Sequence, residues 1–152
     1  MNISKVITPA GISLDLKGKT KQAIIEELLD LLIVTEQVQD RTAALKAVLE
    51  REAKMSTGMQ HGLALPHAKT DTVTRLVGVL GIQRAGIDFH SLDGQPSTLF
   101  ILTLSPLSRT GPHIQFLAEI GRLLSNKVLR DRLLQATTQA DVMAVLQTPV
   151  SP

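Results

Sequence analysis

Two segments in the middle of the sequence constrain the fold most, because residues 75–83 and 97–104 are almost continuously apolar. A strand with one face in water alternates polar and apolar side chains, whereas a strand buried on both faces is apolar throughout. Neither segment approaches the roughly 18 residues that a membrane-spanning helix needs. The two segments therefore predict buried strands in a sheet that is covered on both faces.

The rest of the sequence supplies the covering helices. Alternation at 11–16 and a short apolar run at 62–66 predict two further strands, and apolar residues at helical spacing predict five helices. The first helix begins after Thr20, with Ile24, Leu28, Leu31 and Leu32 on one stripe, and the others cover 40–54, 111–124, 126–136 and 138–146. Helices, then strands, then helices predict an α/β three-layer sandwich. The sheet is expected to be mixed, because some strands follow one another after short turns.

Length and composition limit the class of protein. The 152 residues fit one domain, which we expect at 1–148, followed by a frayed tail at 149–152. The absence of cysteine excludes disulfides, thiolate metal sites and cysteine nucleophiles. A net charge of +2, with three Phe and no Tyr or Trp, argues against a nucleic-acid surface. Residues 1–16 do not have the pattern of a signal peptide, so we expect a cytoplasmic protein without membrane insertion.

Among the four histidines, His67 has the most distinctive surroundings. It follows Pro66 at the end of the run 62–66, and proline cannot continue the ladder of a strand. The sequence therefore predicts that His67 lies just past the end of a strand, where ligands of open α/β sheets bind. Residues 56–58, Ser-Thr-Gly, form a hydroxyl-rich loop that can offer N–H groups to an anion, or that is an ordinary turn.

Three more residues are candidates for this site. His113 follows Gly-Pro, and proline favours the first helical position, so His113 is expected in the first turn beside anion-attracting N–H groups, or simply exposed there. Arg51 lies off the apolar stripe of its helix and can reach solvent or the edge of a cleft. Glu52 falls on that stripe, so it either pairs with a cation or marks the point where the helix leaves the core.

Other chemistries have weaker support. The sequence has no H-E-x-x-H pattern, but a divalent metal held by His61, His67 and His113 stays an alternative. It has no G-x-S-x-G elbow for a serine nucleophile, and neither a P-loop nor a G-x-G-x-x-G motif for a nucleotide. We therefore predict neither a metal nor another cofactor.

The string from Ser56 to Ala68, STGMQHGLALPHA, resembles the phosphorylation-site motif of a known family. It is similar to the enzyme IIA domains of the bacterial phosphoenolpyruvate-dependent sugar phosphotransferase system, in the fructose/mannitol class that includes the nitrogen-regulatory proteins. The resemblance extends over about residues 3–146 through Arg51-Glu52, GIDF at 86–89, LDGQP at 92–96 and His113. It implies a mixed five-stranded sheet between helices, in agreement with the pattern of apolar residues.

The resemblance also implies roles for the candidate residues. His67 would accept a phosphoryl group at Nε2 from the histidine-containing phosphocarrier protein, His113 would support the group, and Arg51 would stabilise it. Such a transfer depends mainly on positioning and charge, and its donor is itself a phosphohistidine, so it needs neither metal nor nucleotide. Because Nε2 must be neutral, the other ring nitrogen of His67 should donate to a fixed acceptor.

The sequence departs from the family pattern at Gln60 and His61, where relatives usually have glycine and asparagine. Gln60 would restrict the loop if its position required positive φ, and His61 adds a titrating group near His67. His90 is interpreted as a surface residue.

Two functions stay open at this point. The protein could pass phosphate to a IIB domain in sugar uptake, or it could be a regulatory module that binds transporters or sensor kinases. The sequence identifies neither the sugar nor the target.

Overall fold

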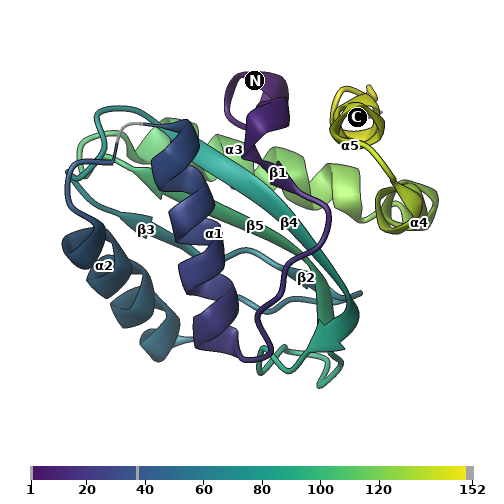
Figure 1. Ribbon diagram of the computed structural model, residues 1–152. Coiled ribbons are helices and arrows are strands. Elements are labelled where there is room, and N and C mark those ends of the chain that lie inside the picture. The colour runs from purple at the N-terminus through teal and green to yellow at the C-terminus, as the bar shows by residue number, and fades with distance from the viewer. Residues whose placement is uncertain (1, 37, 150–152) are drawn as a thin grey trace.

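A mixed five-stranded sheet lies between two layers of helices in the computed structural model, which describes residues 2–36 and 38–149 (Figure 1). The strands are β1 (Ile12–Ser13), β2 (Leu63–Ala64), β3 (His67–Lys69), β4 (Val77–Ile87) and β5 (Ser97–Ser105). The α-helices in the described residues are α1 (Lys21–Thr35), α2 (Arg41–Lys54), α3 (Thr110–Leu124), α4 (Lys127–Gln135) and α5 (Gln139–Leu146). Short 3-10 helices lie at Ile3–Lys5 and Pro9–Gly11. The predicted three-layer sandwich is confirmed.

The two apolar segments form the central strands of the sheet. β4 and β5 pair antiparallel, with Val79 opposite Leu102 and Gly81 opposite Phe100. β1 runs parallel to β4, while β2 and β3 both run parallel to β5 on its other side, which makes the sheet mixed as predicted. β4 is longer than the predicted segment 75–83, because its pairing with β5 resumes at Ile87 after a register shift.

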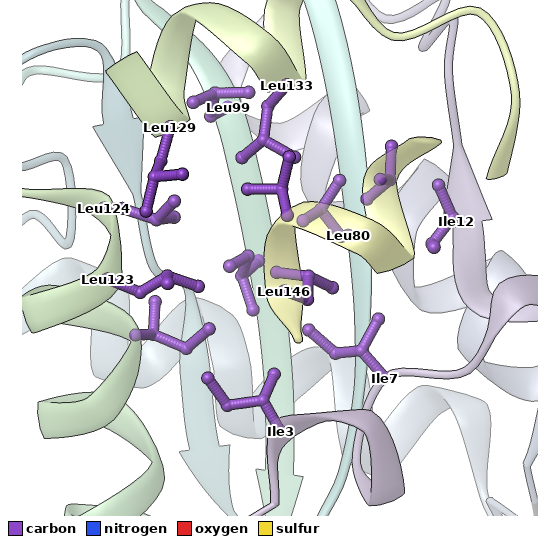
Figure 2. Packing of buried hydrophobic residues seen from close by; sticks show 14 of the residues in the cluster. Ile3, Ile7, Ile12, Leu80, Leu99, Leu123, Leu124, Leu129, Leu133 and Leu146 are labelled. Atoms are coloured by element: carbon purple, nitrogen blue, oxygen red, sulfur yellow. The ribbon is translucent and has the colours of Figure 1, made fainter. Parts of the chain in front are cut away.

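Each face of the sheet has its own hydrophobic core, because successive side chains of a strand point to opposite faces. Phe100 and Leu102 of β5 pack in the core that α1 and α2 cover. Leu99 and Ile101 of the same strand pack in the core that α3, α4, α5 and the N-terminal turns cover (Figure 2). This alternation explains why β5 is apolar along nearly its whole length.

Helix starts follow from capping side chains. Thr20 Oγ1 accepts from the N–H of Ala23 at 3.1 Å, and Thr138 and Asp141 form a capping box at the start of α5. The buried stripe of α1 is broader than predicted, since it includes Ile25 and Leu29, whereas Leu31 is only half-buried. A helix that packs on a sheet buries a wide face, so more of its positions are buried than the four predicted ones.

The predicted strands at the start and in the middle of the chain differ from those observed. The strand expected at 11–16 pairs only over β1, and the strand expected at 62–66 is only β2. Pro66 interrupts the ladder because it has no N–H, but its carbonyl still accepts from the N–H of Thr103 at 3.1 Å. Pairing with β5 therefore resumes at once as β3. His67 follows β2, in keeping with the prediction that a strand ends before it, but it also begins β3, a strand that the sequence patterns did not predict.

The last helix ends at Leu146, with Gln147 as its C-cap. Residues 150–152 of the predicted tail lie outside the described residues. Within the described ranges, no helix is both long and apolar enough to span a membrane.

Arg84 ties the sheet to the C-terminal helices. Its guanidinium donates to three main-chain carbonyls, those of Leu134 (2.7 Å), Leu14 (2.8 Å) and Ala136 (2.7 Å). Since one guanidinium satisfies all three oxygens, it joins the C-terminal end of α4 to β4 and to the segment that follows β1.

We predict that Arg84→Ala lowers the free energy of unfolding by about 2 kcal/mol, because several hydrogen bonds from a charged group are lost at a partly solvated site. Urea denaturation of the variant and the wild type measures this change. Arg132→Ala, at an exposed position on α4, is the control, with an expected change within about 0.5 kcal/mol. Equal effects of the two substitutions would contradict the proposed tie.

Candidate functional site

One ring nitrogen of His67 makes a hydrogen bond to the backbone, and the other is available to react. Its Nδ1 lies 2.8 Å from the carbonyl oxygen of Leu65, and because a carbonyl only accepts, Nδ1 carries the proton. The neutral ring then has its lone pair on Nε2. Burial lowers the pKa of His67, the hydrogen bond to Leu65 opposes that effect, and the charges of Arg51 and Lys69 lower the pKa further. His67 is therefore neutral at pH 7, with Nε2 available as a nucleophile.

His113 lies beside His67. α3 begins at Thr110, so Pro112 is its third residue and His113 its fourth, and the imidazole is only 2% exposed. The two rings meet edge to face, with centroids 5.3 Å apart and an interplanar angle of 86°. The alternative that His113 is simply an exposed first-turn residue is thus wrong, because the helix start packs down on the sheet.

Thr103 holds His113 in this position. Its Oγ1 lies 2.9 Å from Nε2 of His113, and Thr103 is also the register partner of His67 across the β3–β5 ladder. Burial, followed by the charges of His67 and Lys69, lowers the pKa of His113 to about 4. Both rings are therefore neutral at pH 7. The sequence patterns do not single out Thr103, because the strand register that places it here is a tertiary feature.

Two cationic side chains flank the histidines. Arg51, half-buried near the end of α2, donates from Nη1 to the carbonyl of Met55 at 2.8 Å and lines the same groove as His67. Of the two predicted alternatives, solvent or the edge of a cleft, Arg51 therefore takes the second. Lys69 lies two residues after His67 on the same strand, and its Nζ donates to Oγ1 of Thr110 at 2.8 Å. No sequence pattern singles out Lys69, although the two-residue period of a strand puts it on the same face as His67.

Glu52, the acidic residue on the apolar stripe of α2, pairs with a cation. The carboxylate is 6% exposed, and its Oε1 lies 2.7 Å from Nζ of Lys21 at the start of α1. It also accepts from the N–H of Thr57 at 2.8 Å and from its Oγ1 at 2.6 Å. The interpretation that Glu52 pairs with a cation is thus confirmed. The same carboxylate holds the hydroxyl-rich loop through Thr57.

The loop before His67 turns tightly at His61 and Gly62, which both have positive φ, 62° and 76°. The N–H of Leu63 donates to the carbonyl of Gln60 at 3.3 Å, which closes a four-residue turn. Gln60 is not among the residues with positive φ, so the position that demands this conformation is His61. Histidine and asparagine tolerate it better than most residues. His61 and His90 are exposed, as expected for His90.

A groove of about 770 Å³ opens beside the site and is largely apolar. Met55, Met59 and Leu92 line it and are well exposed. Exposed apolar side chains around a reactive group are typical of a protein-binding surface. Over the described parts of the chain, no group of three or more His, Asp or Glu side chains gathers as it would around a metal ion.

Comparison with known proteins assigns the family. The family model of the phosphoenolpyruvate-dependent sugar phosphotransferase system, EIIA 2, matches residues 5–148. The chain is 40% identical over 141 residues to a fructose-specific EIIA component of Haloferax volcanii, covering 92% of each protein. The chain therefore belongs to the enzyme IIA family of the phosphotransferase system, and its role is that of a phosphoryl carrier.

Solved structures agree with this assignment. The nitrogen regulatory protein IIA-Ntr of Neisseria meningitidis superposes with a TM-score of 0.89 at 27% identity, covering 95% of this chain and 98% of that one. The mannitol enzyme IIA of Escherichia coli, in complex with phosphorylated enzyme IIB, superposes with a TM-score of 0.80 at 21% identity, covering 93% and 98% of the two chains. The second likeness supports the fold alone.

The buried His113 makes stability depend on pH. Its pKa of about 4 in the folded protein lies below the ordinary 6.5 of an unfolded chain, so the unfolded state binds the proton first as the pH falls. The stabilisation is fully present above pH 6.5 and is lost between pH 6.5 and 4, by an amount on the order of 3 kcal/mol at most.

We predict that His113→Gln flattens the fall in the free energy of unfolding between pH 7 and 5, measured by urea denaturation. His90→Gln, at an exposed position, serves as the control and should keep the slope of the wild type. Identical slopes in all three proteins would contradict a buried neutral His113.

Proposed function

We propose that His67 accepts a phosphoryl group at Nε2 from the histidine-containing phosphocarrier protein. The observation that carries this proposal is the 2.8 Å hydrogen bond from Nδ1 to the carbonyl of Leu65, which leaves a lone pair on Nε2 beside an open groove. Nε2 attacks phosphorus, the P–N bond of the donor phosphohistidine breaks, and its electron pair returns to the donor ring. No metal or nucleotide enters this exchange.

Cations around His67 stabilise the transferring group. Its transition state is loose and carries negative charge on the equatorial oxygens. Arg51, Lys69 and the N-terminus of α3 offer positive charge there. A single charge contact at 4 Å is worth about 4 kcal/mol at an effective dielectric near 20. That is enough to accelerate the transfer and too little to trap the phosphoryl group.

His113 supports the group in a different way. In the free protein it is neutral and held by Thr103. A phosphoryl dianion beside it favours its protonated form, so His113 gains charge only when the group is present. This arrangement limits repulsion between His113 and the two permanent cations before transfer.

The apolar groove beside His67 suits the docking of protein partners in turn. The fructose-specific relative supports onward transfer to a IIB domain in sugar uptake, and the mannitol enzyme IIA, of the same fold, is known in complex with phosphorylated enzyme IIB. The similarity of the fold to that of the nitrogen regulatory protein IIA-Ntr favours a second role. In that role the phosphorylation state controls binding to a transporter or sensor kinase. Either role places the protein in the cytoplasm with its phosphate donor.

We predict that His67→Ala abolishes phosphoryl uptake while the fold stays intact, because the substitution removes the Nε2 lone pair beside the groove. The assay mixes the protein with the general phosphotransferase enzyme, the phosphocarrier protein and labelled phosphoenolpyruvate. His90→Ala should incorporate label as the wild type does. Undiminished uptake by His67→Ala would refute the assignment of the acceptor.

We predict that Arg51→Ala slows uptake by roughly one to three powers of ten, since a preorganised charge is lost at the transition state. His113→Ala should slow it less than His67→Ala does. Arg132→Ala, far along the chain on α4, is the matched control and should leave the single-turnover rate unchanged. Wild-type rates in both site variants would contradict the electrostatic role.

The two roles after uptake separate in one further experiment. Labelled protein is mixed with fructose-type and mannitol-type IIB domains. Loss of label to either supports sugar transport, whereas retained label with both supports regulation.

A further inference from the structure

A chain of hydrogen bonds joins a buried ion pair to the reactive histidine. Nζ of Lys21 lies 2.7 Å from Oε1 of Glu52, whose carboxylate accepts from both the N–H and the Oγ1 of Thr57. The carbonyl of Thr57 accepts from the N–H of Leu65 at 3.0 Å. The carbonyl of Leu65 in turn accepts from Nδ1 of His67 at 2.8 Å. Every link lies within hydrogen-bond distance.

Stability alone does not explain this ion pair. Glu52 occupies an apolar position of α2, and taking two charges out of water offsets much of their attraction. A well-packed apolar residue there would hold the helix about as well. The carboxylate differs from an apolar side chain in one respect, which is that both of its oxygens hold Thr57 in a fixed orientation.

A second set of contacts, made by Ser56 and Gly58, holds the same loop. Oγ of Ser56 donates to the carbonyl of Phe89 at 2.7 Å, and the N–H of Gly58 donates to Oγ of Ser56 at 3.0 Å. Nζ of Lys21 lies 4.8 Å from the centroid of the Phe89 ring, so the cation that neutralises Glu52 also contacts this support. The loop is therefore held at consecutive residues.

We propose that Glu52, neutralised by Lys21, is a positioning residue for phosphoryl transfer. By holding Thr57 with both oxygens it fixes the carbonyl of Leu65, and that carbonyl keeps His67 in the Nδ1–H tautomer with Nε2 free. The tautomer of a histidine is set by the hydrogen bond of its other nitrogen, so a fixed acceptor is what the reaction needs. The inference rests on the proposed role of His67 and adds how its nucleophilic form is maintained.

Glu52→Ala tests the proposal, with Glu50→Ala as the matched control on the same helix. Glu50 is exposed and pairs with Lys46 at 3.8 Å. We expect Glu52→Ala to slow phosphoryl uptake by roughly tenfold or more, by analogy with the loss of a supporting hydrogen bond from a metal-ligating histidine. ¹⁵N NMR of the imidazole should show a mixture of His67 tautomers in this variant and the Nδ1–H form alone in the wild type and in Glu50→Ala.

Glu52→Gln separates anchoring from general destabilisation. Its amide has the shape of the carboxylate, accepts from the N–H of Thr57 through Oε1 and can donate to Oγ1 of Thr57. We expect it to restore the single tautomer and most of the rate. If Glu52→Ala does not fold, Thr57→Val serves as the test instead, because it replaces the hydroxyl that bonds to Glu52 with a methyl group. We expect Thr57→Val to take up phosphate more slowly than Glu50→Ala.

The result that overturns the inference is a folded Glu52→Ala, or Thr57→Val in its place, with the Nδ1–H tautomer and the uptake rate of the wild type. The tautomer is read without any phosphate donor, so this outcome is distinct from a failure of the proposed function. That second failure would show instead as unchanged labelling of His67→Ala.

Discussion

The pairing of β3 with β5 is the constraint on which the site depends. It places His67 directly opposite Thr103, whose hydroxyl holds His113, and brings Lys69 to the start of α3. A shift of one residue would turn His67 to the other face of the sheet, under α2. Pro66 breaks the edge strand without ending it, so the reactive ring lies on rigid backbone next to an open groove.

The electrostatics of the site follow from this arrangement. Two histidines in edge-to-face contact, partly or fully buried beside cations, both have a lowered pKa and stay neutral. Neutral rings suit a carrier, because the acceptor needs a lone pair and because the arriving phosphate supplies the negative charge itself. The buried Glu52 offsets part of the positive field at His67. This balance of charge suits the proposed acceptance and release of a phosphoryl group.

Local patterns predict most of the fold. The apolar strands β4 and β5, the helix caps at Thr20 and Thr138, and the two-sided core all follow from short-range periodicity and from the need to bury both faces. The errors are local as well. They concern how far β4 and β1 extend and the resumption of pairing after Pro66, because the extent of a strand depends on a neighbouring strand that the local sequence does not describe.

The layered architecture, the family motif and the candidates His67, His113 and Arg51 can be inferred from the sequence alone, because they depend on periodicity and on residue identity at short spacing. The contacts of Thr103 and Lys69 in the candidate site, and the pairing of Glu52 with Lys21, are seen only in the folded protein. Those contacts join residues from different strands and helices. Their distances are fixed by strand register and helix packing, which no local pattern contains.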